Sequence, residues 1–457
     1  MAFATPWAVA DAQGPAPGDP PPPPVRNLWD DGSQVTTVHP EAPEPKPASR
    51  ARPSFFDPEP EPVAPPTAAQ RRRRRWATPG VAVSTVAMLG ALVAVGEVVT
   101  RTGNSRPPDP NQVTSLAPVN GMSDAARLQA TVDDLSHYVE RARGLTFLRP
   151  VKATLLSDAE FDARLKLLGA NAPDQARLTG RIATLEALGI LAPNFSPGPD
   201  DTKGILGYYD PKTKTLAVRG NVTDVFVKRT LVHELTHALQ DQRFDLGRMP
   251  SGEDDVGLAA RSVVEGDARR IENGWVATLS PSEQDLLERQ TRSRGFEAFP
   301  ANHYAGYVGF PYANGSQFVN ELQGRGGQAL IDEAFRRFPT SSKEIVSSNL
   351  WRQHRAPIDV AAPNPGGKAV DQGQLGLIDL VYMFVSVLPS ETVVPSALTW
   401  GGARYVTWQG PKGPCVQATL AATDNESAQL GSALRQWAGD GNRVISGAGP
   451  FTIDACA

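Results

Sequence analysis

Cysteine is nearly absent from this 457-residue chain, which contains only Cys415 and Cys456, both near its C-terminal end. Two cysteines cannot form the framework of a disulfide-rich domain, and the lack of any Cys-x-x-Cys pair argues against a thiolate zinc site of the finger type. If this end of the chain lies in an oxidising compartment, we expect the two cysteines to form a disulfide. The alternative is two free, buried thiols.

A strong charge of one sign is also absent, because 45 basic and 49 acidic residues leave a net charge of −4. This balance gives no indication of a nucleic-acid partner, so none is expected. Histidine is scarce as well, with six residues in the whole chain, and a chance clustering of histidines is therefore uncommon.

Bulky apolar residues are sparse in residues 1–75, which instead contain a proline run at 20–24 and repeated Glu-Pro and Ala-Pro pairs. Such a segment cannot bury enough apolar surface to offset its conformational entropy. We therefore predict a disordered, proline-rich tail over residues 1–75.

Charged residues are missing from 76–96, directly after an arginine run at 71–75. About 20 apolar residues in a helix can cross the hydrocarbon core of a bilayer. We predict one transmembrane helix over residues 76–100, a single-pass cell-membrane anchor with the N-terminus in the cytoplasm and the rest outside. A cleavable signal peptide is one alternative, although the segment before it would be unusually long. A buried core helix is the other, and the polyarginine flank argues against it.

A proline-rich linker at 101–122 precedes what we predict to be one extracytoplasmic domain, residues 123–457, of the α+β class and mainly helical. Apolar spacing predicts helices at 124–143, 158–169 and 174–188, and strands at 151–156, 205–209 and 215–218, the last two joined as a hairpin. We expect helices to dominate the remainder, with breaks near 276–281, 295–315 and 362–375.

One motif indicates a particular chemistry, the sequence His-Glu-Leu-Thr-His at residues 233–237. On a helix, His233 and His237 project from one face about one turn apart, where their imidazoles can share a metal ion. Neutral imidazole is a common zinc ligand, so zinc is the expected metal. Glu234 is then placed to take a proton from zinc-activated water as the general base of peptide-bond hydrolysis. Two ordinary helical histidines are the alternative interpretation.

An apolar stripe on the same segment supports this arrangement. Leu231, Leu235, Ala238 and Leu239 follow helical spacing on the side away from the two histidines. We therefore expect one face of this helix to pack on the core and the other to line a cleft.

A catalytic zinc site needs a third protein ligand, and Glu265, on a predicted helix over residues 256–275, is the best candidate. Gly266 beside it is informative, because glycine within a helix costs about 1 kcal/mol relative to alanine. Close approach of this helix to the motif helix would offset that cost. Spacing alone leaves other assignments open: Asp241, Asp255 or Asp267 as the ligand, or an ordinary surface pair of Glu265 with Arg261 or Arg269.

Several segments resemble a group of bacterial membrane-anchored metallopeptidases of the gluzincin clan. The strongest similarity lies in LVHELTHALQDQRF at 231–244 followed by VEGDA at 264–268. Weaker similarity occurs at 207–211, 311–319 and 400–405.

This resemblance implies a zincin-like metallopeptidase fold with a small sheet before the motif helix. It further implies that His233, His237 and Glu265 bind zinc and that Glu234 is the general base. One departure from the group is Ala403, where an acidic residue is common.

The resemblance also implies a substrate strand and an oxyanion-stabilising side chain. In gluzincins a strand beside the zinc helix pairs with the substrate backbone, and residues 205–209 or 216–218 would serve. A tyrosine, histidine or arginine usually stabilises the tetrahedral oxyanion. The candidates for that role are His303, Tyr304, Tyr307 and Tyr312, each of which is also consistent with ordinary packing.

Three functions are compatible with these features. The leading hypothesis is a membrane-tethered zinc peptidase that acts on a protein or peptide substrate outside the cytoplasmic membrane. The second is a catalytically degenerate zincin-like binding or assembly module at the cell envelope. The third is a zinc hydrolase that does not cleave peptides.

Overall fold

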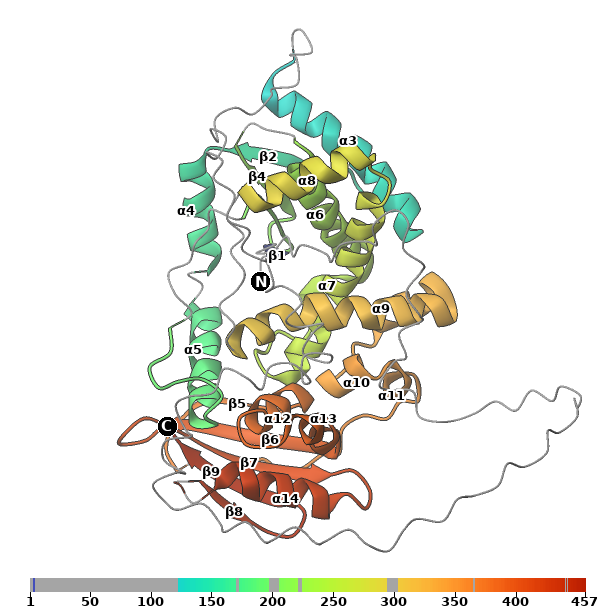
Figure 1. Cartoon of the computed structure of the whole chain (residues 1–457). Helices are drawn as coiled ribbons and strands as arrows, with labels where there is room; N and C mark the ends of the chain where they lie inside the picture. Colours follow the sequence, from blue (N-terminus) through green and yellow to red (C-terminus); the bar gives the residue numbers. More distant parts are fainter. Residues whose placement is uncertain are drawn as a thin grey trace, which may run out of the picture. The chain divides into compact units, whose positions relative to one another are not determined.

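The computed structural model describes residues 3–4, 122–169, 172–196, 205–220, 224–293, 303–364, 366–439, 441 and 443–457 (Figure 1). Most of the predicted tail at 1–75, the predicted membrane helix at 76–100 and nearly all of the linker at 101–122 lie outside these residues. Within the part that is described, no helix is both long and apolar enough to cross a membrane.

The first part of the described chain combines helices with a small sheet. Its elements are α3 (Asp124–Arg143), β2 (Ala153–Leu156), α4 (Asp158–Gly169), α5 (Ala172–Ala187), β3 (Gly207–Asp210), β4 (Thr215–Arg219), α6 (Val225–Phe244), the 3₁₀ helix η2 (Leu246–Arg248), α7 (Asp255–Val276) and α8 (Pro281–Ser293). The helices, strands and hairpin predicted before the His-Glu-Leu-Thr-His motif are confirmed, with small shifts at their ends.

The strand order of this sheet is β1-β3-β4-β2, where β1 is Phe3–Ala4. β3 and β4 form an antiparallel hairpin, and β2 runs parallel to β4. The turn forms because the Asp210 carboxylate accepts hydrogen bonds from the Lys212 N–H and the Thr213 hydroxyl, the local bonding by which aspartate favours turns. Lys214 completes it with a left-handed φ of 58°. The hairpin sets β3 beside α6, which carries the motif.

β1 lies at the edge of this sheet, against β3. It pairs antiparallel with β3, with Phe3 opposite Tyr209 and Ala4 opposite Tyr208. The membrane anchor predicted at 76–100 lies outside the described residues and stays a prediction.

α6 is fixed at its start and buried along most of its length. The Asp224 carboxylate accepts a hydrogen bond from the Val227 N–H at 2.9 Å, which caps the first turn. The apolar stripe packs into a core shared with α3 and the hairpin. The opposite face is also covered, because His233 and His237 are each only 1% exposed and α7 packs against this helix. The expectation that this face lines an open cleft was therefore wrong.

α7 crosses the helix α9 (His303–Arg336) at two glycines. A Cβ on Gly266 would lie 2.2 Å from the carbonyl carbon of Gly315, and a Cβ on Gly315 would lie 2.1 Å from the Ser262 carbonyl oxygen. The close approach predicted at Gly266 is confirmed, but its partner is α9 and not the motif helix α6.

α9 begins within the region 295–315, where a break was predicted. It runs from His303 to Arg336, includes Pro311 and is kinked at Gly327, whose φ of 64° is not helical. Tyr307, Phe310 and Phe318 are buried at helical spacing along it. Their burial outweighs the low helix propensity of the proline and the glycines around it, so the predicted break was wrong for residues 303–315. Residues 295–302 lie outside the described part of the chain, between the end of α8 and the start of α9.

The last part of the chain contains a second sheet where mainly helices were expected. Its elements are α10 (Ser342–Val346), α11 (Ser348–Arg352), β5 (Ala369–Gly373), α12 (Leu377–Phe384), α13 (Ser390–Leu398), β6 (Trp400–Gln409), β7 (Pro414–Ala422), α14 (Ser427–Ala438), β8 (Val444–Ser446) and β9 (Phe451–Cys456). The strands are antiparallel in the order β5-β6-β7-β9-β8.

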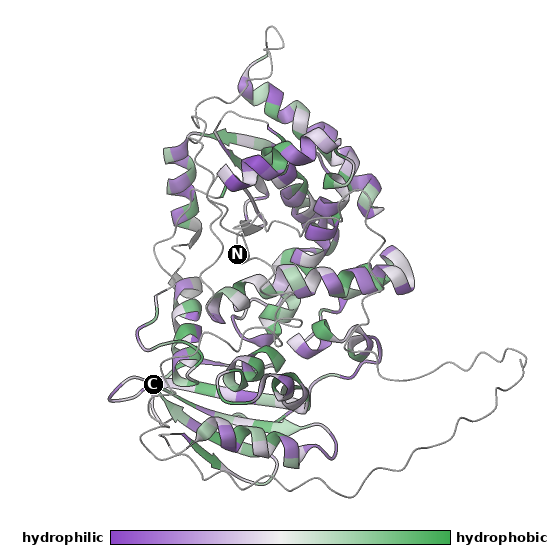
Figure 2. Ribbon diagram, in the orientation of Figure 1, coloured by the Kyte–Doolittle hydropathy of each residue, from purple (hydrophilic) through white to green (hydrophobic). Residues whose placement is uncertain are grey.

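Helices do dominate the remainder of the chain, as expected, but the strands of this sheet were not predicted. β6 is buried on both faces and lacks the alternation of polar and apolar residues that reveals most strands. Hydrophobic residues run along this sheet (Figure 2). β7 and β9 bring Cys415 opposite Cys456, and the predicted disulfide is confirmed. The α+β, mainly helical class is confirmed as well.

The segment at 400–405 serves packing within β6. A Cβ on Gly402 would lie 2.0 Å from the Ile358 carbonyl oxygen, so the chain at 358 leaves room only for glycine. Ala403 is 2% exposed, and the alanine that departs from the resembling group thus occupies a tightly packed strand position.

Candidate metal centre

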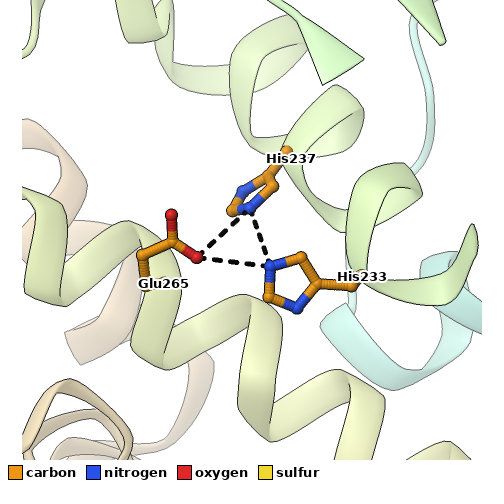
Figure 3. Close-up of side chains that lie close together, drawn as sticks. All are labelled: His233, His237 and Glu265. Atoms are coloured by element: carbon orange, nitrogen blue, oxygen red, sulfur yellow. Dashed lines mark hydrogen bonds and ion pairs between the residues drawn. The ribbon is translucent and has the colours of Figure 1, made fainter. Parts of the chain in front are cut away.

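Three buried side chains from two helices converge on one point (Figure 3). The Nε2 atoms of His233 and His237, both on α6, lie 3.0 Å apart. The Glu265 Oε2 atom, from α7, lies 3.2 Å from the His233 Nε2 and 3.5 Å from the His237 Nε2. This group can hold a metal ion.

The three alternative acidic candidates are engaged elsewhere. Asp267 pairs with Arg143 at 2.8 Å, and Asp241 pairs with Lys214 at 2.7 Å. Asp255 accepts a backbone N–H at the start of α10. Of the four acidic residues considered from the sequence, Glu265 is the one that joins the two histidines.

Each imidazole is oriented by an acceptor on its far side. The Nδ1 of His233 lies 2.9 Å from a Glu272 carboxylate oxygen, and the Nδ1 of His237 lies 2.9 Å from the Gln240 side-chain oxygen. These oxygens can only accept, so each Nδ1 donates its proton and each Nε2 is the atom left for a metal. Both Nε2 atoms face the Glu265 carboxylate, and each can bind a metal once it carries no proton.

The Gln240 amide is itself fixed by its neighbours. Its Nε2 donates to the Val264 carbonyl and to an Asp267 carboxylate oxygen, each at 3.1 Å. These bonds require the amide oxygen to face His237. Asp267 in turn accepts from the fully buried Arg143, so the orientation of this imidazole depends on α3 as well as on α7.

Glu272 is held by two arginines. It accepts hydrogen bonds from Arg229 on α6 and from Arg269 on its own helix. Burial raises the pKa of Glu272, but the two arginines and His233 outweigh this effect and hold it well below its usual range. The residue is therefore an ionised acceptor for the His233 N–H across the pH range of ordinary work.

The converging groups attract positive charge. Burial raises the pKa of Glu265, but the neighbouring His237 and His233 outweigh it and bring the value down to about 2. Burial lowers the pKa of His233, but its bonds to Glu265 and Glu272 outweigh this effect and raise it to about 9. Two carboxylates thus enclose one imidazole, and the site is suited to a cation in place of the proton.

Glu234, the predicted general base, lies beside the three converging groups and is not one of them. It is completely buried, and its carboxylate accepts the Tyr209 backbone N–H of β3 at 2.8 Å. The hairpin thus helps to fix the position of this carboxylate.

Among the oxyanion candidates, Tyr312 is the one at this centre. Its ring lies 6.4 Å from the His233 ring at an interplanar angle of 29°. Burial, the carboxylates of Glu265 and Glu234, and a hydrogen bond to Glu265 raise the pKa of Tyr312 well above its usual range. The hydroxyl therefore stays protonated and can donate.

The other three candidates have different surroundings. The His303 ring nitrogen donates to the Ile190 carbonyl at 3.0 Å. Tyr307 donates to Asp379 near the second sheet, and Tyr304 lines the same pocket as Tyr307 and Tyr312. Sequence reasoning could not separate these four residues, because all lie on one helix.

Gln240 and Glu272 were not identified from the sequence. Gln240 follows His237, the residue it supports, by one helical turn. Glu272 follows Glu265 by two turns and shares its helix face, from which it supports His233. This spacing is a usable signal, although many polar residues on exposed helices show it too.

No family model, no curated protein and no solved structure matches this chain.

Proposed function

We propose that this protein is a zinc-dependent peptidase with a zincin-like fold of the gluzincin kind. The observation that carries the proposal is the triangle of His233, His237 and Glu265, whose edges measure 3.0, 3.2 and 3.5 Å. Ligand atoms around a tetrahedral zinc with bonds of about 2.0–2.1 Å are separated by about 3.3 Å. The donor set, two neutral imidazoles and one carboxylate, also matches that of catalytic zinc sites.

The chain's own residues support hydrolysis at this centre. When bound, zinc supplies Lewis-acid chemistry that brings the pKa of water toward 7. Glu234 accepts the proton of the attacking water and passes it to the leaving amine. Tyr312 donates a hydrogen bond to the oxygen that becomes negative in the tetrahedral transition state. β3 lies against Glu234, and an extended peptide would pair with the edge of β3 that β1 covers in this structure.

Substitution of Glu234 by glutamine tests the catalytic assignment. We expect peptide cleavage by the full-length chain to fall by about 10²–10⁴-fold, because the amide cannot accept the proton. Zinc content should stay unchanged. Glu333→Gln is the matched control, because the Glu333 side chain is 45% exposed on α9. This variant should cleave peptides at the normal rate. Full activity in Glu234→Gln would contradict the general-base role.

The complete burial of Glu234 and near-complete burial of both histidines favour one alternative, a catalytically degenerate binding module. Such a module would bind zinc without cleaving peptides. The test is to measure both zinc content and cleavage of a broad peptide library by the wild-type chain. One full equivalent of zinc with no cleavage would support this second function over hydrolysis.

We also propose a single-pass cell-membrane location, with residues 76–100 as the anchor and residues 123–457 outside. Leu167 is 74% exposed and provides a labelling position. In Leu167→Cys, a membrane-impermeant thiol reagent should label intact cells. Labelling only after lysis would place residues 123–457 inside and contradict the proposed orientation.

A further inference from the structure

A pocket of about 240 Å³ adjoins the candidate metal centre. It lies between α5, α7 and α9, and Glu265 and Tyr312 form one part of its lining. Arg181, on α5, forms another part. Because the pocket includes a proposed zinc ligand and the proposed oxyanion donor, a side chain next to the scissile bond can enter it.

The lining is mostly apolar and long enough for an extended side chain. Tyr307 and Tyr312 both line it and are five residues apart on α9, which corresponds to a rise of about 8 Å. Aliphatic side chains from all three helices complete the wall: Leu178, Ile182, Leu185, Leu258 and Val308. This lining favours an apolar stem.

Arg181 gives the pocket one polar requirement. The residue is 5% exposed, and its Nη2 pairs with Asp379. Its guanidinium also lies over the Tyr307 and Tyr405 rings, 5.5 and 5.8 Å from their centres. Its Nη1 is buried without a hydrogen-bond partner in the described structure. A buried donor of this kind is costly unless an acceptor reaches it.

The charge around Arg181 favours an uncharged acceptor. Asp379 already neutralises the guanidinium, so a second carboxylate would add a buried negative charge without a counterion. Glu253 lines the same pocket and pairs with Arg261 at 3.3 Å. A carboxylate has more acceptor sites than this one pair uses, so Glu253 can accept an amide N–H.

We propose that this pocket selects a substrate residue with an unbranched apolar stem and a terminal carboxamide, which among the common amino acids is glutamine. The Arg181 Nη1 donates to the amide oxygen, and Glu253 accepts from the amide nitrogen. The proposal rests on the proposed peptidase function, because it assumes that the pocket receives a peptide side chain.

Binding to a chain that cannot cleave tests the proposal. The probes are three peptides, acetyl-Ala-Ala-Xaa-Ala-Ala-amide with glutamine, glutamate or methionine at the variable position. They are titrated calorimetrically into the full-length Glu234→Gln chain loaded with zinc. We expect the glutamine peptide to bind at least about tenfold more tightly than the other two, because only it satisfies Arg181 without adding charge. Equal binding, or tighter binding of methionine or glutamate, would overturn the assignment.

A variant that fills the pocket tests whether the glutamine preference arises there. Val308 is partly exposed and lines the pocket, so Val308→Phe should reduce its volume without disturbing the core. The glutamine preference should disappear in this variant and persist in Gln317→Phe, a control at an exposed position of the same helix. A preference that survives Val308→Phe would place the binding elsewhere and overturn the proposal.

The same peptides separate this proposal from the function on which it rests. If the chain with Glu234 intact cleaves none of them while the glutamine preference in binding holds, hydrolysis fails and the pocket assignment stands. If it cleaves all three equally, hydrolysis stands and the pocket assignment fails.

Discussion

The two imidazoles of the candidate centre are held by different acceptors, a carboxylate for His233 and a neutral amide oxygen for His237. The carboxylate is backed by two arginines, whereas the amide is backed by the buried pair of Asp267 and Arg143. Such outer partners fix the tautomer and direction of a ligand, and their loss usually weakens metal binding.

Replacement of Gln240 by methionine should weaken zinc binding. Methionine keeps the length of the side chain but removes the oxygen that accepts the His237 N–H, so we expect zinc affinity to fall about 10–100-fold. Competition with a chromogenic chelator measures the change. Gln317→Met, at an exposed position of α9, is the control. Unchanged affinity in Gln240→Met would show that the amide does not orient the ligand.

Replacement of Tyr312 by phenylalanine should lower kcat and leave KM nearly unchanged. The hydroxyl is proposed to donate to the oxyanion, a contact that exists only in the transition state, and loss of one such donor costs about 10²–10³-fold. Steady-state kinetics on a cleaved peptide provide both constants. A rise in KM at constant kcat would instead assign Tyr312 to substrate binding.

At the scale of single residues, the sequence indicated the proposed ligands but not the residues that support them. His233, His237 and Glu265 follow from residue type and spacing together with family resemblance. Gln240 and Glu272 do not, because their importance depends on burial between α6 and α7, and local spacing contains no information about burial. Tyr312 could not be separated from its neighbours on α9 for the same reason.

Among the elements, the crossing of α7 and α9 determines the position of Glu265 relative to Tyr312. Gly266→Ala should destabilise the fold by about 1–3 kcal/mol, because the new methyl group would overlap the Gly315 backbone. Thermal unfolding measures this change. Gly324→Ala, also on α9, is the matched control.

A Cβ at Gly324 meets no atom within 4 Å, so that substitution should be neutral or stabilise by up to about 1 kcal/mol. Equal Tm values for the two alanine variants would contradict the close packing of α7 on α9.

Elements whose apolar residues follow helical or strand spacing were predictable, and β6 and the start of α9 were not. α3 buries Leu128, Val132, Leu135 and Val139 at helical spacing, and its predicted range is confirmed. β6 lacks a polar face, and α9 contains Pro311 and several glycines, so local rules suggested other structures there. Tertiary packing overrode those rules in both places.

Across the whole molecule, α7 links the candidate centre to the second sheet. It carries Glu265 near its middle and Asp255 at its start. Asp255 accepts hydrogen bonds from the Ser342 N–H at 3.1 Å and from the Gln374 side chain at 3.2 Å. Gln374 directly follows β5, so the second sheet helps to hold the helix that bears the proposed third ligand.

This link should make stability depend on pH. Burial and the nearby Asp379 raise the pKa of Asp255 from 3.8 to about 7. The folded state therefore favours the protonated acid, and this contribution is complete below about pH 4 and lost as the pH rises to about 7. The loss is at most about 4 kcal/mol, or several degrees in Tm.

Asp255→Asn tests this dependence, because asparagine cannot ionise. The fall in Tm between about pH 4 and about pH 7 should be smaller in the variant than in the wild type by several degrees. Parallel Tm profiles for the two chains would show that Asp255 does not titrate in this range.

The zinc content of the purified full-length chain tests the central claim most directly. Elemental analysis after zinc loading and dialysis should give about one equivalent for the wild type, as expected for one site with three protein ligands. His137→Ala, a control at a 71% exposed histidine side chain on α3, should also give about one equivalent. The double variant His233→Ala/His237→Ala should give nearly none. A wild-type value well below one equivalent, or one that the double variant leaves unchanged, would contradict the metal centre.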